Sequence, residues 1–144
     1  MAISSPAFGS GRAIPREYTC SGRGLSPPLE WSGAPNGTRE LALLMRDIDA
    51  PGGNFVHWVV VGIPPETDSV TAGHAPRGGV QGVNSAGRAG YTPPCPPRGD
   101  RPHRYLITIL ALARRTELKT GFDPSRLAGT GLASGTLVGT YARP

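Results

Sequence analysis

Residues 55–63 read FVHWVVVGI, and this stretch decides the type of fold. Apart from His57, its side chains are apolar at odd and even positions alike, as in a β-strand that is buried on both faces. Pro64 and Pro65 follow directly and end the strand, because proline cannot donate to a sheet ladder. The sequence therefore predicts a buried strand over residues 55–63.

Three further apolar runs predict strands on either side of this one. They cover residues 41–45, 105–113 and 137–141. Between residues 64 and 104 no clear element is predicted, and so long an irregular stretch within a compact domain is usually functional. The chain is therefore expected to be mainly β.

One short helix is predicted near the C-terminus. Asp123 followed by Pro124 is typical of an N-cap with proline at the first helical position. The helix would run through residues 125–134, where Gly129 and Gly131 weaken it.

Length and charge limit the possible functions. The 144 residues predict a single domain, residues 1–144, that buries about two-thirds of its chain surface. We find no signal peptide and no apolar run that could span a membrane, so the expected location is cytoplasmic, with no integral membrane association. The net charge of +5 comes from scattered arginines without interleaved aromatic residues, which argues against nucleic acid as a partner.

Two polar motifs stand at the edges of the apolar runs. The first is Asp47-Ile48-Asp49-Ala50-Pro51, followed by His57, and the second is Pro94-Cys95-Pro96-Pro97, followed by His103-Arg104-Tyr105. If the fold brings them together, one pocket would hold two carboxylates, two imidazoles and a phenol. Such a group is costly to desolvate, and it therefore usually marks a binding or catalytic site.

Each motif also has a structural interpretation. Side chains two apart on a strand share a face, so Asp47 and Asp49 would point the same way if extended, and the repulsion between them would raise one pKa. Alone, however, Asp-x-Asp can be a turn, and His57 can be a core histidine bonded to a carbonyl. Two Asp and two His without tight spacing predict no metal site, and no motif for an organic cofactor is found.

The order of the motifs carries more information than any one of them. From the N-terminus they run Ser5-Pro6-Ala7-Phe8, Tyr18-Thr19-Cys20, Ser26-Pro27-Pro28-Leu29, then Asp47 to Pro51, His57-Trp58, Gly82-Val83-Asn84, Tyr91, Pro94 to Pro97, His103-Arg104-Tyr105 and Leu137 to Tyr141. This series resembles the phosphatidylethanolamine-binding protein family in its short bacterial and archaeal form, often described as Raf kinase inhibitor-like. The resemblance runs nearly end to end.

The resemblance implies a fold and a site. The fold is a large antiparallel sheet packed with a smaller one, plus a few short helices, and members of this short form are often homodimers. The site is a pocket at the sheet edge that holds a small anion, such as phosphate, acetate or a phospholipid headgroup. By motif it comprises Asp47, Asp49, Pro51, His57, Cys95, Pro96, Pro97, His103 and Tyr105, with Tyr91 as one wall.

The chain departs from the family pattern close to this pocket. Ile48 replaces a proline between the two aspartates, and Arg46 stands where an acidic residue is common. Pro93 replaces a glycine, and Ser21 replaces an aspartate after Cys20. These changes affect the expected ligand more than the expected fold.

Two functions from different classes follow. The first is binding of a small phosphate- or carboxylate-bearing ligand, with His57, His103 and Tyr105 as donors. The second is a cofactor-independent isomerase, dehydratase or cyclase that acts on a carbonyl-bearing metabolite of natural-product biosynthesis. In that case Asp47 or Asp49 is the general acid or base, one of the two histidines is its counterpart, and Tyr105 polarises an oxygen.

The two cysteines lie in loop motifs, where a disulfide is geometrically conceivable. The expected cytoplasmic location favours free thiols, with that of Cys95 at the pocket rim.

Overall fold

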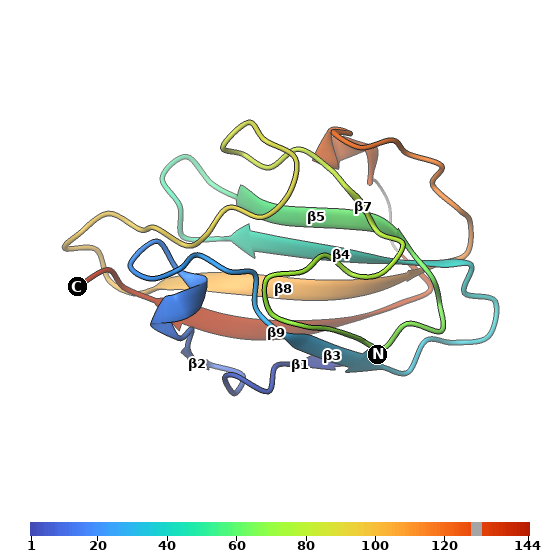
Figure 1. The fold of residues 1–144 in the computed structure, drawn as a ribbon, viewed down its shortest axis with the longest axis horizontal. Coiled ribbons are helices and arrows are strands. Elements are labelled where there is room, and N and C mark those ends of the chain that lie inside the picture. The colour runs from blue at the N-terminus through green and yellow to red at the C-terminus, as the bar shows by residue number, and fades with distance from the viewer. Residues whose placement is uncertain (128–130) are drawn as a thin grey trace.

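The computed structural model describes residues 1–127 and 131–144 and consists of two β-sheets (Figure 1). The larger has the order β2 (Arg12–Ala13), β9 (Ala133–Tyr141), β8 (His103–Leu112), β4 (Glu40–Asp47), β5 (Phe55–Ile63) and β7 (Val80–Gln81). The smaller has the order β1 (Ala2–Ser4), β3 (Leu29–Ser32) and β6 (Ser69–Val70). Every pairing is antiparallel except that of β2 with β9. The helical elements of the described residues are two single 3₁₀ turns, η1 (Arg16–Tyr18) and η2 (Pro124–Arg126). The mainly β fold class predicted from the sequence is therefore confirmed.

The predicted strands all exist, and one has the predicted bounds. β5 spans Phe55–Ile63 as expected, and β4 and β9 extend beyond their apolar runs. β8 begins two residues before its run and ends one residue short of it, at Leu112. Residues 64–102, up to the start of β8, hold only the two-residue strands β6 and β7. This long irregular segment is thus fixed by its contacts rather than by regular structure.

The predicted helix over residues 125–134 is wrong, although its start is not. Asp123 caps η2 by accepting from the backbone N of Ser125 at 2.8 Å. The turn ends at Arg126, residues 128–130 lie outside the described residues, and Ala133 and Ser134 pair with β8. Ladder bonds to a long strand take precedence over a helix that two glycines weaken.

The main core lies between the two sheets. On β8 the odd-numbered side chains from His103 to Ala111 are buried and the even-numbered ones are half-buried or exposed. The buried row packs with Leu41, Leu43 and Met45 of β4 and with Trp31 of β3. His103 and Tyr105 therefore share the core-facing side of β8, as the sequence predicts.

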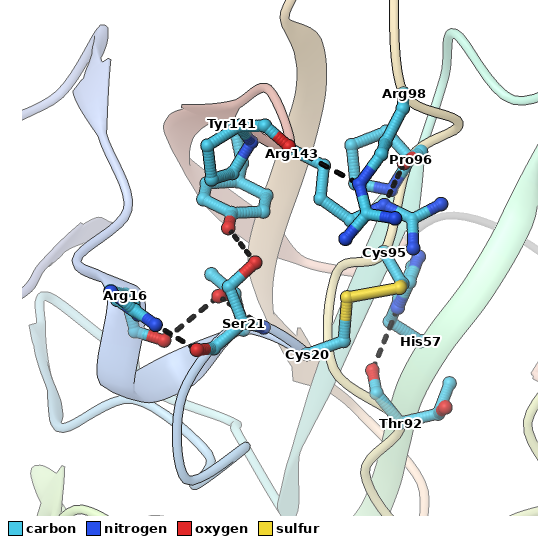
Figure 2. Close-up of a disulfide and its surroundings, with 12 residues drawn as sticks. Arg16, Cys20, Ser21, His57, Thr92, Cys95, Pro96, Arg98, Tyr141 and Arg143 are labelled. Atoms are coloured by element: carbon cyan, nitrogen blue, oxygen red, sulfur yellow. Dashed lines mark hydrogen bonds between the residues drawn. A yellow bond between two sulfur atoms is a disulfide. The ribbon is translucent and has the colours of Figure 1, made fainter.

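A disulfide joins Cys20 to Cys95, so the expectation of free thiols is wrong (Figure 2). The two residues are 75 positions apart in sequence, but their Cα atoms lie 5.3 Å apart. The backbone N of Cys20 donates to Pro94 O at 3.0 Å, which sets the two loops side by side. The expectation rested on the compartment, whereas the structure brings the thiols within bonding reach.

No helix among the described residues is long and apolar enough to cross a membrane.

Candidate functional site

At one end of the large sheet, three neighbouring strands place polar side chains close together. β4 ends at Asp47, where β5 and β8 begin, because both neighbours run antiparallel to it. Asp47 is in register with Phe55 on one side and with Tyr105 on the other. In Figure 1 the loop after β4, the loop before β8 and the C-terminus lie at this same end. Asp47, His57, His103 and Tyr105 thus come together, and we call them the site cluster.

Asp47 holds the cluster together. Its carboxylate is buried, with 4% of the residue exposed. One oxygen, Oδ1, accepts from the backbone N of Asp49 at 2.9 Å, and Oδ2 lies 2.6 Å from Nδ1 of His103. The turn suggested by Asp-x-Asp is therefore real, and the same side chain also enters the cluster.

His103 lies between two carboxylates. Its Nδ1 bonds Asp47, and its Nε2 lies 2.9 Å from Oδ2 of Asp100. Burial lowers the pKa of His103, but the hydrogen bonds and charges of Asp47 and Asp100 outweigh burial and raise it above the ordinary value. His103 is thus an imidazolium whose two N–H groups are both engaged.

Asp100 is a member of the site that the sequence analysis missed. It stands three residues before His103, in a loop whose other residues are Pro, Gly and Arg. The spacing Asp100-x-x-His103 was the signal available in the sequence, but a loop has no period that would tell which way its side chains face.

His57 differs from His103. Its Nδ1 lies 2.7 Å from Thr92 O, and a carbonyl can only accept, so Nδ1 carries the hydrogen. Burial lowers the pKa of His57 and leaves the ring neutral, with the lone pair on Nε2. Within the described part of the chain, Nε2 has no hydrogen-bond partner. The expectation that His57 supplies a cationic donor is therefore wrong, and Nε2 is an acceptor.

Tyr105 completes the cluster. The residue is fully buried, and its hydroxyl has no hydrogen-bond partner in the described residues. Burial, and then the charge of Asp47, raise the pKa of Tyr105, so the hydroxyl keeps its proton. The ring lies edge-on to that of His57, with centroids 5.3 Å apart. An unpaired buried hydroxyl costs about 1–3 kcal/mol, so it points to a bound partner.

Asp49 does not join Asp47. Its carboxylate accepts from Nε and Nη2 of Arg104, both at 2.9 Å, and from the backbone N of Arg104 at 2.8 Å. These bonds lower the pKa of Asp49 to about 2, so the expected rise by repulsion is wrong for this residue. The physical reason is that β4 ends at Asp47, and the turn that follows sends Asp49 elsewhere.

Ile48 supports this turn. Its backbone N donates to Arg104 O at 3.2 Å, a bond that a proline in this position cannot make. Replacing the family's proline thus fastens the turn to β8 and helps to place Asp49 against Arg104.

The other residues expected at the site serve mainly to hold the loops. Tyr91 packs edge-on against Trp58 and donates to Tyr18 O at 2.7 Å. The carbonyl of Pro96 accepts from Nε of Arg143 at 2.9 Å (Figure 2), while Pro51 and Pro97 are exposed. Cys95 is in the disulfide, and Ser21 accepts a hydrogen bond from the Tyr141 hydroxyl.

A surface cavity of about 420 Å³ adjoins the cluster at His103. Its lining also contains Asp49, Asp100, Arg101, Pro102 and Arg104. A larger cavity of about 500 Å³ runs along β1 and β3, but it contains none of the cluster residues. The chemistry therefore favours the smaller cavity. Across the described residues, no group of three or more His, Cys, Asp or Glu side chains could hold a metal ion.

Known proteins resemble this chain over nearly its whole length. Residues 4–142 match the family model for phosphatidylethanolamine-binding protein. A Mycobacterium tuberculosis protein named "Putative lipoprotein LppC" is 41% identical over 98% of this chain and 72% of its own length. A UPF0098 protein of Methanothermobacter thermautotrophicus is 38% identical over 99% of both chains.

The fold matches as well. The crystal structure of a phosphatidylethanolamine-binding protein homologue from Chlamydia trachomatis superposes with a TM-score of 0.92 at 36% identity, over 99% of this chain and 97% of the other. The chain therefore belongs to the phosphatidylethanolamine-binding protein family.

Proposed function

We propose that the site cluster binds a small ligand through a carboxylate or phosphate group. The observation that carries this proposal is the fully buried Tyr105 hydroxyl, which lacks a partner within the described residues. The ring that carries it lies edge-on to that of His57, whose Nε2 is an acceptor. A donor beside an acceptor is complementary to a group that has both, such as P–OH with P=O, or a protonated carboxyl.

The family membership supports the same ligand class. Phosphatidylethanolamine, which names the family model, carries a phosphate group. His103 would add positive charge next to that group, because its two carboxylate partners keep it protonated.

Calorimetric titration with inorganic phosphate and with acetate tests the proposal. Both should bind to the wild-type protein, and Tyr105→Phe should weaken binding roughly tenfold, since one hydrogen bond to a charged group is lost. Binding should persist through neutral pH and weaken only as the pH rises through the raised pKa of His103. Equal affinities of wild type and Tyr105→Phe would exclude the cluster as the binding site.

The neutral state of buried His57 supports the enzyme hypothesis. It also moves the role of general base from the aspartates to this histidine. Asp49 is held as an anion by Arg104, and both oxygens of Asp47 already accept hydrogen bonds. Neutral His57 is a better general base, because burial keeps it unprotonated and its ring lies edge-on to that of Tyr105. Tyr105 would then donate to the oxygen of a carbonyl-bearing substrate.

A solvent-exchange experiment separates binding from turnover. An enzyme of this kind should exchange the α-hydrogen of a suitable carbonyl compound with D₂O, and His57→Asn should abolish the exchange. Candidate compounds are the products of neighbouring biosynthetic genes. If none of them exchanges while phosphate binds, the protein is a binding module.

The cellular location remains a prediction, and the disulfide bears on it. Disulfides persist in oxidising compartments, and the mycobacterial relative carries the name of a lipoprotein. Both favour export over the cytoplasmic location expected from the sequence. Thiol labelling of each cell fraction tests this, since only an oxidised pool leaves Cys20 and Cys95 unlabelled.

Self-association into a homodimer is likewise a prediction, which sedimentation measures directly.

A further inference from the structure

We propose that Asp100 is a built-in competitor for the ligand, and that it sets the affinity and the charge preference of the pocket. Its carboxylate occupies Nε2–H of His103, and both residues line the cavity. The inference rests on the proposed function, because it names the group that an incoming carboxylate or phosphate must replace.

The contact has the geometry of a bound ligand. Oδ2 of Asp100 lies 2.9 Å from Nε2, within the range of a charge-assisted hydrogen bond. The His103 side chain is 5% exposed, whereas that of Asp100 is 43% exposed. The imidazole is therefore fixed within the protein, while the carboxylate stands at the solvent boundary. Of the two partners, Asp100 is the one that can leave.

The two bonds of His103 are unequal for the same reason. Asp47 is buried at the end of β4, and its other oxygen is fixed by the Asp49 backbone. Asp100 belongs to no strand, and its backbone N makes only a turn bond of 3.2 Å to Pro97 O. An external anion would therefore exchange with Asp100 and leave the bond to Asp47 intact.

The loop that carries Asp100, residues 97–102, is anchored on both sides. Asp100 can therefore move away from His103 without movement of the rest of the chain. On one side Pro96 O is held by Arg143, and Cys95 is held by the disulfide. On the other side His103 opens β8. Only the exposed residues 97–102 lie between these anchors, and they can turn Asp100 outward without disturbing the sheet.

The local charges explain why an external anion is expected to replace Asp100 on His103 rather than to bind beside it. His103 faces Asp47 from β4 and Asp100 from its loop, which together leave a single net negative charge. Asp49 is neutralised by Arg104, the Tyr105 hydroxyl is uncharged, and Arg101 also lines the cavity. A second anion added beside Asp100 would be repelled, whereas exchange keeps the charge constant. The competition should lower the affinity for any anion.

Substitution of Asp100 tests the inference, with inorganic phosphate as the probe. Asp100→Ala should bind phosphate roughly tenfold more tightly than wild type, because no internal carboxylate has to be displaced. Asp100→Asn should fall between the two, since its amide oxygen still accepts from Nε2–H but carries no charge. Asp68→Ala is the matched control, because Asp68 is an exposed aspartate that lines a cavity with no residue in common. It should leave the affinity unchanged.

The outcomes separate the two proposals. A gain in Asp100→Ala that Asp68→Ala does not share supports the inference. Equal affinities of Asp100→Ala and wild type, with Tyr105→Phe weakened, would overturn the role of Asp100 and leave the proposed function standing. If neither wild type nor Asp100→Ala binds phosphate or acetate, both proposals are wrong.

Discussion

The two imidazoles of the site cluster are almost equally buried, yet they differ in charge. His57 is 5% exposed and His103 is 4% exposed. Burial lowers the pKa of His57, which bonds a backbone carbonyl, whereas two carboxylates raise the pKa of His103 despite burial. Burial alone therefore does not decide the state of a histidine. What decides it is whether the partner carries a charge.

The comparison also separates two regions of the molecule. The His57 half depends on Thr92, in an irregular segment that the disulfide ties to the N-terminal loop. The His103 half depends on Asp47, across a ladder in which β4 and β8 pair from Glu40 to Asp47. One half is thus held by loops and a covalent bond, and the other by a sheet.

Removing the disulfide should break the loop-held half, and it is the change with the largest expected effect. Cys20→Ser combined with Cys95→Ser should lower the free energy of unfolding by roughly 3–4 kcal/mol, because 75 residues separate the two cysteines. Urea unfolding measures the loss. The His57 ring resonances should shift, and those of His103 should not. If both rings shift equally, the halves are not independent.

Asp47→Asn should break the sheet-held half. The free energy of unfolding should fall by roughly 2 kcal/mol, as is usual for a hydrogen bond to a charged group. The pKa of His103 should fall, because its main stabilising partner is lost. Asp49→Asn is the matched control: its carboxylate bonds Arg104, so the pKa of His103 should change little. Imidazole titration by NMR would contradict the assignment if the two variants behaved alike.

The pH dependence of stability should reveal the two histidines with opposite signs. His103 has a raised pKa in the folded state, so its contribution is complete below about pH 6.5 and is lost as the pH rises through the folded pKa. His57 has a lowered pKa, so stability falls as the pH falls from about 6.5 through its folded pKa. The two effects act on opposite sides of about pH 6.5, so the stability of the wild-type protein should be greatest near that pH.

The substitution His57→Asn should leave only the contribution of His103 to the pH dependence of stability. In His57→Asn the amide can still donate to Thr92 O, but the group no longer titrates, so the opposing effect on the acid side disappears. Unfolding measured from pH 5 to 8 should then show stability that is level up to about pH 6.5 and falls as the pH rises further. A profile unchanged from wild type would mean that the pKa of His57 does not differ between the folded and unfolded states.

Tyr105→Phe should have the smallest effect on stability. It tests the residue whose ring lies next to both histidines. The hydroxyl has no partner among the described residues, so its removal should raise the free energy of unfolding by about 1 kcal/mol, the lower end of the cost of an unpaired buried group. Thermal unfolding measures this. A large loss would show that the hydroxyl bonds a structural water or the protein itself.

Much of the fold could be predicted because its signals are local. The bounds of β5 and the common face of His103 and Tyr105 follow from apolar runs and from the period of a strand. A common site for Asp47 and both histidines was expected only because the order of motifs resembles that of a known family. Asp100 and the direction of Asp49 could not be predicted, since both lie in turns.

The sequence by itself determined the strands, the family and the residues from which a site is built. Only the tertiary structure decided their chemical states. Asp47 became the partner of an imidazolium and Asp49 that of an exposed arginine, although they stand two residues apart. The cysteines became a disulfide because the contact between Cys20 and Pro94 brought their loops together. The physical reason is that protonation and pairing depend on neighbours in space, and in loops the sequence does not specify those neighbours.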